Sequence, residues 1–376
     1  MLVWLALSLA ALLYIYALYP VALAVLVRLR GARPVRRQSV TPTITVVISA
    51  FNEAAVIARK LENTLALDYP PEQLRVVVVS DASTDGTDAI VRAVHDERVQ
   101  LVQMVRRRGK TAGLNHVLPT LGTDLVVFTD ANVMYERMAL RQLAANFADP
   151  QVGCVTGETR YLESGQGAAD VGERTYWSYE TRIKALESAL GSTVGGDGAI
   201  YAIRCSLWRA LPEDAISDFL NPIQIVLSGW RAVFEPGAVC FEETAGTTTI
   251  EYRRRVRIVS RSWRAVFQAR GALNPLHGGL FTWCLVSHKV LRWFSGVFIG
   301  IAMAVTGFGL GLFQVGYADL GTSMLPAAER GMAGSLINVT RLLGIVVAAP
   351  GIGALHAILG TYARTYAIVG LALLAA

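Results

Sequence analysis

Residues 125–132 read LVVFTDAN and form the most informative stretch of the chain. The four apolar residues predict a buried strand, which the oxygen-bearing side chains of Asp130 and Asn132 follow. At the carboxyl end of a strand, such a pair can hold a hard divalent cation, which prefers oxygen ligands and readily bridges a diphosphate. Short turns with Asp and Asn also follow many strands without binding anything. The pair alone therefore leaves both interpretations open.

The sequence around this stretch alternates apolar strands with amphipathic helices. This alternation predicts an α/β fold with a mostly parallel sheet flanked by helices. Ligands of such sheets bind outside the carboxyl ends of the strands, where the polar segments beginning at Phe51, Asp81 and Asp130 fall. The expected strands are residues 43–49, 75–80, 99–104 and 124–128, and the expected helices are 54–67, 87–94 and 112–118.

The N-terminal end of the chain is apolar enough to predict a membrane helix. Hydrophobic residues make up 53% of the 376 residues, and the mean hydropathy is +0.41. Residues 2–27 carry no charge, which predicts an uncleaved transmembrane anchor. Arginines follow at once, from Arg28 to Arg37, so the positive-inside rule places the next domain in the cytoplasm. We therefore expect a multi-pass protein of the cell inner membrane.

A basic amphipathic segment follows the α/β block. Residues 251–270 interleave arginines with apolar and aromatic residues, which predicts a helix on a membrane surface; an ordinary exposed helix is the alternative. Apolar stretches then continue to the C-terminus. The net charge of +6 lies largely beside these segments, so anionic lipid is a simpler partner than nucleic acid. The expected domains are an anchor at 1–28, an α/β domain at 41–250, an interface region at 251–293 and transmembrane helices at 294–376.

Cysteine and histidine give little support to a metal site of their own. The four cysteines have no CxxC spacing, and the five histidines are scattered. This pattern suits a reducing compartment and argues against a zinc ribbon or a disulfide framework.

Four further segments carry polar groups that could bind a ligand or take part in catalysis. Each of these groups also has a purely structural explanation. Asp81 could accept hydrogen bonds from a nucleobase or a ribose, or could belong to a simple turn. Lys110 could neutralise a phosphate, although the spacing around it is not that of a P-loop. The glycines of 195–198 could admit a bulky ligand or form an ordinary loop. Asp218 could be a general base, but on sequence alone a helix N-cap is the better interpretation.

Together these segments resemble family 2 glycosyltransferases, in the membrane-bound inverting branch with cellulose, chitin and hyaluronan synthase relatives. The resemblance covers roughly residues 41–293. It implies a GT-A fold, a nucleotide-diphospho-sugar donor (usually a UDP-sugar), Mg²⁺ or Mn²⁺, and a lipid or glycan acceptor in polysaccharide or glycolipid biosynthesis. The matching segments are FNEA (51–54), SDASTDGT (80–87), RGKTAGLN (108–115), FTDAN (128–132), GDGAIYAIR (196–204), SDF (217–219) and GWRAVFEPGA (229–238).

The resemblance also implies roles for individual residues of this chain. Asp218 would be the catalytic base of a hexosyl- or N-acetylhexosaminyltransferase. Asp130 and Asn132 would be the metal ligands. The implied donor-binding residues are Asn52, Glu53, Asp81, Lys110 and Asp130, and the implied acceptor-binding residues are Gly198, Ala199, Tyr201, Arg261 and Trp263.

Two positions depart from the family pattern. Asn132 replaces a second aspartate, so metal binding would depend more on the diphosphate. The processive synthases carry Gln-x-x-Arg-Trp, whereas residues 257–263 read RIVSRSW and lack the glutamine. We therefore expect transfer of one or a few sugars rather than synthesis of a long polymer.

A second resemblance begins near Gly296. The segments around Gly307 and Arg341 resemble late helices of a major-facilitator transporter, which suggests a fused or truncated tail acting as an anchor. Arg341 within an apolar stretch would normally pair inside a complete bundle. Two alternatives to an enzyme remain: a non-catalytic membrane module that binds a nucleotide-sugar, and part of a transporter.

Overall fold

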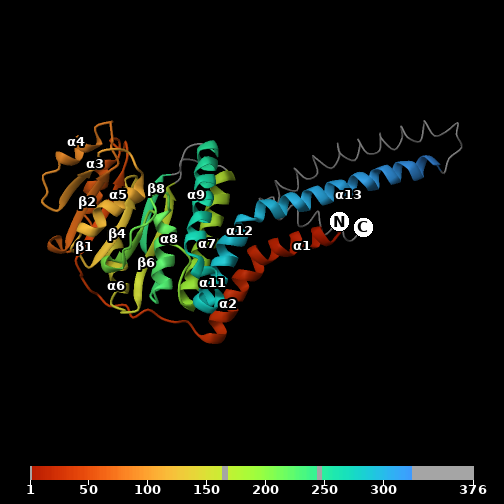
Figure 1. The fold of residues 1–376 in the computed structure, drawn as a ribbon, viewed down its shortest axis with the longest axis horizontal. Coiled ribbons are helices and arrows are strands. Elements are labelled where there is room, and N and C mark those ends of the chain that lie inside the picture. Colours follow the sequence, from red (N-terminus) through yellow and green to blue (C-terminus); the bar gives the residue numbers. More distant parts are fainter. Residues whose placement is uncertain (1, 163–167, 244–247, 324–376) are drawn as a thin grey trace. The chain divides into compact units, whose positions relative to one another are not determined.

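The computed structural model describes residues 2–162, 168–243 and 248–323. The chain divides into two compact units, one of residues 11–296 and one of residues 1–10 with 297–376. The larger unit contains the sheet and all the segments that carry the resemblance to family 2 glycosyltransferases (Figure 1). The stretch that resembles a transporter falls mostly on residues 324–376, outside the described residues.

The described part of the larger unit is built on one mixed, eight-stranded sheet. Its strand order is β3-β2-β1-β4-β7-β6-β8-β5. The strands are β1 (Ile44–Ala50), β2 (Leu74–Ser80), β3 (Val99–Gln103), β4 (Leu125–Asp130), β5 (Val133–Tyr135), β6 (Val152–Leu162), β7 (Tyr201–Arg204) and β8 (Arg231–Glu243).

The half of the sheet formed by β1 to β4 confirms the α/β prediction. Strand β1 pairs in parallel with β2 on one side and with β4 on the other, and β2 pairs in parallel with β3. Strands β1, β2 and β3 are each followed by a helix, and this connection returns the chain for another parallel strand.

The second half of the sheet corrects the expectation of a mostly parallel arrangement. Strand β7 is antiparallel to both β4 and β6, and β5 is antiparallel to β8, whereas β6 and β8 are parallel. Strand β5 follows β4 after only two residues, and the connection from β6 to β7 runs through a long helix and the glycine segment. These connections differ from the regular strand–helix repeat that a parallel sheet requires.

Helices cover both faces of the sheet. Successive strand residues alternate between two buried clusters: Val46 and Ile48 pack with α3, α4 and α6, whereas Val47 packs with α5 and α8. The helices of these layers are α3 (Ile57–Leu65), α4 (Thr87–Arg92), α5 (Lys110–Val117), α6 (Ala139–Asn146) and α8 (Ser217–Leu227).

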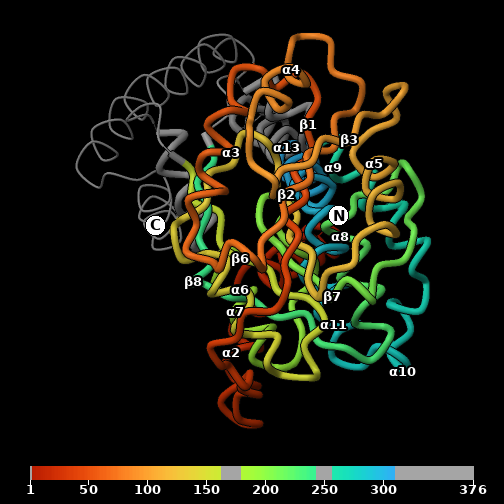
Figure 2. The backbone as a smooth tube through the Cα atoms, turned by 90° about the vertical axis from the view of Figure 1, so that its left-hand side faces the viewer, coloured from red at the N-terminus to blue at the C-terminus, as the bar shows by residue number. Residues whose placement is uncertain are grey.

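A third buried cluster joins the remaining helices of the larger unit. It includes Tyr19, Ile183, Phe219, Ala265 and Leu285, which come from five different helices. Helix α9 lies beside α8 (Figure 2). The helices that contribute to it include α2 (Tyr19–Arg30), α7 (Ala168–Leu190), α9 (Thr248–Gln268), α11 (Leu280–Leu285), the π-helical turn Val286–Val290 and α12 (Leu291–Trp293). The short helix α10 (Pro275–Gly278) contributes no residue to this cluster.

One described helix at the N-terminal end meets the length and composition of a membrane span. The continuous helix Leu2–Arg30, which includes α1 (Leu2–Leu13), is long and apolar enough to cross a bilayer. The pair 280–293 and 295–309, where α13 (Ser295–Ser323) begins, would count as a second candidate if it formed one span. Buried core helices and signal sequences have the same length and composition, so membrane insertion stays a prediction. The expected spans at 333–360 and 362–376 lie outside the described residues.

Candidate active site

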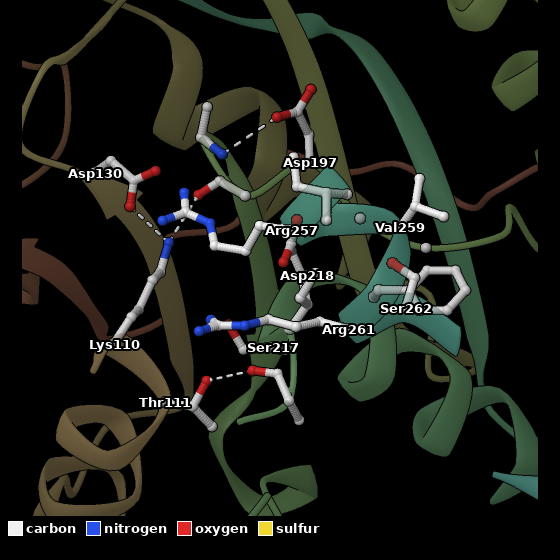
Figure 3. A pocket seen from close by; sticks show the side chains of 18 of the residues that line it. Lys110, Thr111, Asp130, Asp197, Ser217, Asp218, Arg257, Val259, Arg261 and Ser262 are labelled. Carbon is white, nitrogen blue, oxygen red and sulfur yellow. Dashed lines mark hydrogen bonds and ion pairs between the residues drawn. The ribbon is translucent and has the colours of Figure 1, made fainter. Parts of the chain in front are cut away.

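The polar segments that follow β1, β2 and β4 meet at one edge of the sheet. Register brings them together, because Ser49 pairs with Asp130 and Ala50 pairs with Ser80. A cavity of about 740 Å³ opens at this edge. Asp81, Lys110, Asp130 and Asp218 all line it, although they come from four separate parts of the chain. Figure 3 shows Lys110, Asp130 and Asp218 at the cavity.

The loops after β1 and β2 are held by each other. Asn52 has a φ of 56°, and its side-chain oxygen accepts the N–H of Thr84 at 2.9 Å. The carboxylate of Asp85 accepts the N–H groups of Ala54 and Thr87 at 2.9 and 3.0 Å. Asn52 and Glu53 thus lie outside the cavity walls, and the first of them shapes the loop.

Asp81 fixes the loop that carries Lys110. Each oxygen of its carboxylate accepts one backbone N–H at 2.8 Å, from Arg108 and from Gly109. Gly109 has a φ of 95°, a conformation that side chains other than glycine rarely adopt. Helix α5 begins at the next residue, so this turn sets the position of Lys110 at the cavity wall.

Lys110 bridges two sides of the cavity. Its ammonium donates to Asp130 at 2.6 Å and to the carbonyl oxygen of Gly198 at 3.4 Å (Figure 3). Burial acts to lower the pKa of Lys110, but the negative charges of Asp130 and Asp218 outweigh it and raise the pKa. A permanent positive charge therefore lies between the two carboxylates.

A buried lysine supports the strand end that carries Asp130. Lys60 is fully buried and donates to the Thr129 hydroxyl at 3.0 Å and to the Val133 carbonyl at 2.5 Å. Burial lowers its pKa to about 7. These two hydrogen bonds flank the segment from Asp130 to Asn132 and fix its backbone.

The oxygen atoms around Asp130 fit a hard divalent cation that is coordinated mostly by a bound diphosphate. One oxygen of Asp130 contacts Lys110, so the other oxygen can bind a cation. The amide nitrogen of Asn132 donates to Glu242 at 3.4 Å, so the side-chain carbonyl oxygen of Asn132 can also bind the cation. Burial and the charge of Asp130 raise the pKa of Glu53. Among the described residues, no group of three or more His, Cys, Asp or Glu side chains is placed to hold a metal alone.

Asp218 is held at the cavity by its backbone. It lies in the first turn of α8, and Pro222 lies four residues later in the same helix. Because proline has no N–H, the carbonyl of Asp218 lacks its usual helical donor. The N–H of Gly196 donates to that carbonyl instead, at 2.6 Å. The glycine segment is thus fastened directly to the residue expected to be the base.

The Asp218 side chain has the properties of a base that works near neutral pH. Burial raises its pKa from the ordinary 3.8 to about 6, against the opposing charge of Lys110 and with the help of Asp197. Its carboxylate approaches Gly198 so closely that a Cβ added there would lie 2.9 Å from an oxygen of Asp218. A side chain at this position would therefore displace the carboxylate.

The structure divides the expected acceptor residues between the cavity and its surroundings. Gly198, Ala199 and Arg261 line the cavity. Tyr201 is fully buried and stacks on Phe128, with ring centroids 4.4 Å apart, so it supports the wall from behind. Trp263 packs on Trp293, 5.0 Å away, and lies behind the wall as well.

Several residues that line the cavity were not predicted as site residues from the sequence. Arg257 lies one helical turn before Arg261, and both guanidinium groups reach from α9 toward the side where Lys110 lies (Figure 3). No described residue forms an ion pair with either. Arg107 stacks over the Phe51 ring at 3.7 Å, and both residues line the cavity. The four-residue spacing of the two arginines was a usable signal, whereas the Arg107–Phe51 pair joins loops distant in sequence.

A buried ionic cluster forms another part of the wall. His288 contacts Glu180 at 2.9 Å and Glu187 at 2.7 Å, one with each ring nitrogen. Lys289 and Arg292 contact Glu180 at 2.7 and 2.6 Å. The cluster joins α7 to the segment SHKVLRW (287–293). The pattern of that segment gave no hint that its charges turn inward.

Comparisons with known proteins identify the family of this chain. Residues 42–261, more than half of the chain, match the family model described as "Glycosyltransferase like family 2". A β-monoglucosyldiacylglycerol synthase from Synechocystis is 33% identical over 229 residues, which cover 57% of this chain and 47% of the relative. An N-acetylglucosaminyltransferase from Rhizobium meliloti is 26% identical over 264 residues, covering 65% and 61%. The chain thus spans about half the length of such curated relatives.

One solved structure resembles almost the whole chain. A mannosyltransferase from Pyrobaculum calidifontis, in complex with GDP-Man and Mn²⁺, superposes with a TM-score of 0.67. The match covers 91% of this chain and 92% of the other, at 24% sequence identity. This likeness shows a shared GT-A-like α/β fold.

Proposed function

Because the chain belongs to the glycosyltransferase-like family 2, we propose that it transfers a sugar from a nucleotide-diphospho-sugar to an acceptor hydroxyl with inversion at the anomeric carbon. The names of the curated relatives favour glucose or N-acetylglucosamine as the transferred sugar, and the motif resemblance favours UDP as its carrier, as in UDP-glucose or UDP-GlcNAc. The acceptor is a lipid or a glycan at the cytoplasmic face of the membrane. Residues 41–250 form the catalytic domain, and residues 251–293 form the membrane-surface region.

One observation carries this proposal. Asp81, Lys110, Asp130 and Asp218 line the same cavity, with the Lys110 ammonium 2.6 Å from Asp130. A nucleotide and its diphosphate need a polar nucleoside site, cations for the phosphates and a base on the acceptor side. These four residues supply such groups within one space.

The donor occupies the end of the cavity beside β1, β2 and β4. Arg107 stacked on Phe51 provides a flat surface for a nucleobase, and Asp81 lies next to it. Lys110, Arg257 and Arg261 offer positive charge to the diphosphate. Positive charge placed where negative charge develops on the departing phosphate lowers the barrier to its departure.

Asp218 acts on the acceptor. The acceptor oxygen forms a bond to the anomeric carbon as the bond between that carbon and the diphosphate oxygen breaks, and the nucleoside diphosphate leaves. The carboxylate of Asp218 takes the proton of the hydroxyl in this step. With a pKa of about 6, it is ionised at neutral pH and basic enough to assist.

Asp130 and the Asn132 carbonyl would hold Mg²⁺ or Mn²⁺. When bound, the ion supplies positive charge that neutralises the departing diphosphate. Since these two residues offer few ligands, we expect the ion to bind tightly only together with the donor. Lys60 keeps the ligand segment in place from behind.

The test is nucleoside diphosphate release from UDP-glucose, UDP-GlcNAc and GDP-Man with Mn²⁺, for the parent chain and for Asp218→Asn. Asparagine keeps the shape of the side chain but cannot take a proton. We expect kcat to fall by about a hundredfold or more while the donor Kd stays the same. Equal turnover by both chains removes Asp218 from the role of base, and no turnover of any donor by the parent chain contradicts catalysis.

A matched control lies four residues earlier. Asp214 is an exposed carboxylate that pairs with Arg264 at 2.7 Å, outside the cavity. Asp214→Asn makes the same chemical change in the same loop region and should leave kcat within about twofold of the parent, since exposed ion pairs contribute little.

A further inference from the structure

An unbroken series of aromatic rings leads from the cavity to the protein surface. Phe219 contacts Trp293 with ring centroids 6.0 Å apart, and Trp293 contacts Trp263 at 5.0 Å. Trp263 then contacts Phe267 at 5.9 Å and Phe294 at 5.4 Å. We call these five residues the aromatic ladder.

The inner end of the aromatic ladder lies beside the base. Phe219 directly follows Asp218 in α8, and both Phe219 and Trp293 line the cavity. Ile216, Ile258 and Val259 add apolar side chains to the same walls. The acceptor side of the cavity therefore combines a carboxylate with an apolar surface.

The outer end of the aromatic ladder is exposed. Phe267 is 57% exposed and Phe294 is 40% exposed. Clustered large apolar side chains at a surface mark a place where another apolar body binds. Phe294 immediately precedes α13, whose first residues are apolar enough to contribute to a candidate span.

Charged side chains also line the cavity. The guanidinium groups of Arg257 and Arg261 extend toward the side where Lys110 lies (Figure 3). Lys289 and Arg292 of the same wall are held by Glu180. Polar contacts are therefore available beside Asp218, and the path outward from it is apolar.

A glycan acceptor fits the aromatic ladder poorly. Sugars bind to open ring faces and need hydrogen-bonding side chains around each ring. The rings of Trp263 and Trp293 meet at 56° and pack on each other and on Phe219, Phe267 and Phe294, so their faces are largely taken. A flexible hydrocarbon chain needs only an apolar surface.

We propose that the acceptor is a membrane lipid, with its hydroxyl beside Asp218 and its hydrocarbon chain along the aromatic ladder. This inference rests on the proposed function and names the acceptor class for the same site. The reaction is the one given above: the lipid oxygen replaces the diphosphate at the anomeric carbon, and Asp218 receives the proton.

Photocrosslinking tests where the chain lies. The probes are diacylglycerol and phosphatidic acid with a diazirine in one acyl chain, each added to the full-length protein in phosphatidylcholine nanodiscs. We expect crosslinks on the peptides with Trp263, Phe267 and Trp293, and excess dioctanoylglycerol or dioctanoyl phosphatidic acid should compete them away. Crosslinks confined to α1 and α13, or competition by cellotetraose instead, overturn the proposal.

Substitution at the exposed end gives a second, kinetic test. The double variant Phe267→Ser, Phe294→Ser changes only partly exposed rings, and it should raise the KM for the accepted dioctanoyl lipid about tenfold with kcat retained. Leu276→Ser is the control, because Leu276 is 94% exposed in α10 and away from the aromatic ladder. An unchanged KM in the double variant contradicts the inference.

Donor hydrolysis without any lipid, measured in the same preparations, distinguishes a wrong lipid site from a wrong proposed function. If the parent chain hydrolyses a donor but crosslinks only outside the aromatic ladder, the lipid site is wrong and the proposed function stands. If no donor is hydrolysed or transferred under any condition, the proposed function itself fails.

Discussion

The two ends of the cavity are fixed in different ways. At the donor end, backbone groups fix most of the geometry. Asp81 accepts hydrogen bonds from two backbone N–H groups, and the chain turns at Gly109 into α5. At the acceptor end, the parts come from α8, α9 and α12 and meet through side chains, with one backbone hydrogen bond from Gly196 to Asp218. One end is fixed mainly by backbone hydrogen bonds, whereas the other is assembled from distant helices.

This difference predicts different kinetic consequences for the two ends. A donor end that is already in its binding geometry loses mainly affinity when one contact is removed. An acceptor end that places a base loses mainly rate, because a small displacement of the base weakens catalysis strongly. Substitutions on the two sides should therefore separate into changes of donor Kd and changes of kcat.

The largest effect is expected from Gly198→Ala. The added Cβ would lie 2.9 Å from the Asp218 carboxylate, so the carboxylate must move. We expect kcat to fall about a hundredfold with the donor Kd within about twofold of the parent. Gly191→Ala is the control, since its Cβ would meet nothing within 4 Å. A large loss of donor affinity in Gly198→Ala would break the separation between the two ends.

The pH dependence of turnover should report the same base. Burial raises the pKa of Asp218 to about 6, so kcat should fall about tenfold per pH unit below 6 as the base becomes protonated. The donor Kd should change much less over that range. A rate that stays flat down to about pH 5 would show that Asp218 is not the titrating group.

Because its pKa is raised, the Asp218 carboxylate lowers the stability of the folded chain at neutral pH. Because the folded chain holds this proton more tightly than the unfolded chain, Asp218 favours folding below about pH 3.8. That contribution is lost as the pH rises through about 6. Asp218→Asn should thus raise the melting temperature more at about pH 8 than at about pH 5. An equal shift at both pH values would contradict the raised pKa.

The donor end was predictable from the sequence because its signals are local. Strands β1 to β4 are apolar runs that end in polar turns, and parallel pairing brings those turns to one edge. Asp81, Lys110 and Asp130 therefore fall near one another once the strand order is known. Their individual roles stay predictions.

The acceptor end was not predictable in the same way. The antiparallel pairing of β7 depends on a long connection, and the contacts of Arg257 and Trp293 depend on how α9 and α12 pack. Pro222 in α8 reads as a helix breaker, but its effect on the Asp218 carbonyl becomes visible only with Gly196 in place. Such contacts join residues without a common local pattern.

Pro222→Ala restores a helical N–H that can bond to the Asp218 carbonyl. The bond from Gly196 would then have a competitor, and the base would be held less firmly. We expect kcat to fall about three- to tenfold with an unchanged donor Kd. The melting temperature should not fall, because alanine suits a helix interior better than proline does. A loss of stability in parallel with the loss of rate would make the role of Pro222 purely structural.

The smallest effect is expected at the donor end, from Arg107→Met. Methionine keeps an apolar contact with Phe51 but removes the cation from its ring face, 3.7 Å from the ring centroid. An exposed cation–π contact contributes about 0.5 to 1 kcal/mol, so the donor Kd should rise about two- to fivefold with kcat unchanged. Arg106→Met is the matched control, as Arg106 is exposed and does not line the cavity. If Arg107→Met lowered kcat instead, the donor end would take part in placing the base, and the two ends would be one coupled site.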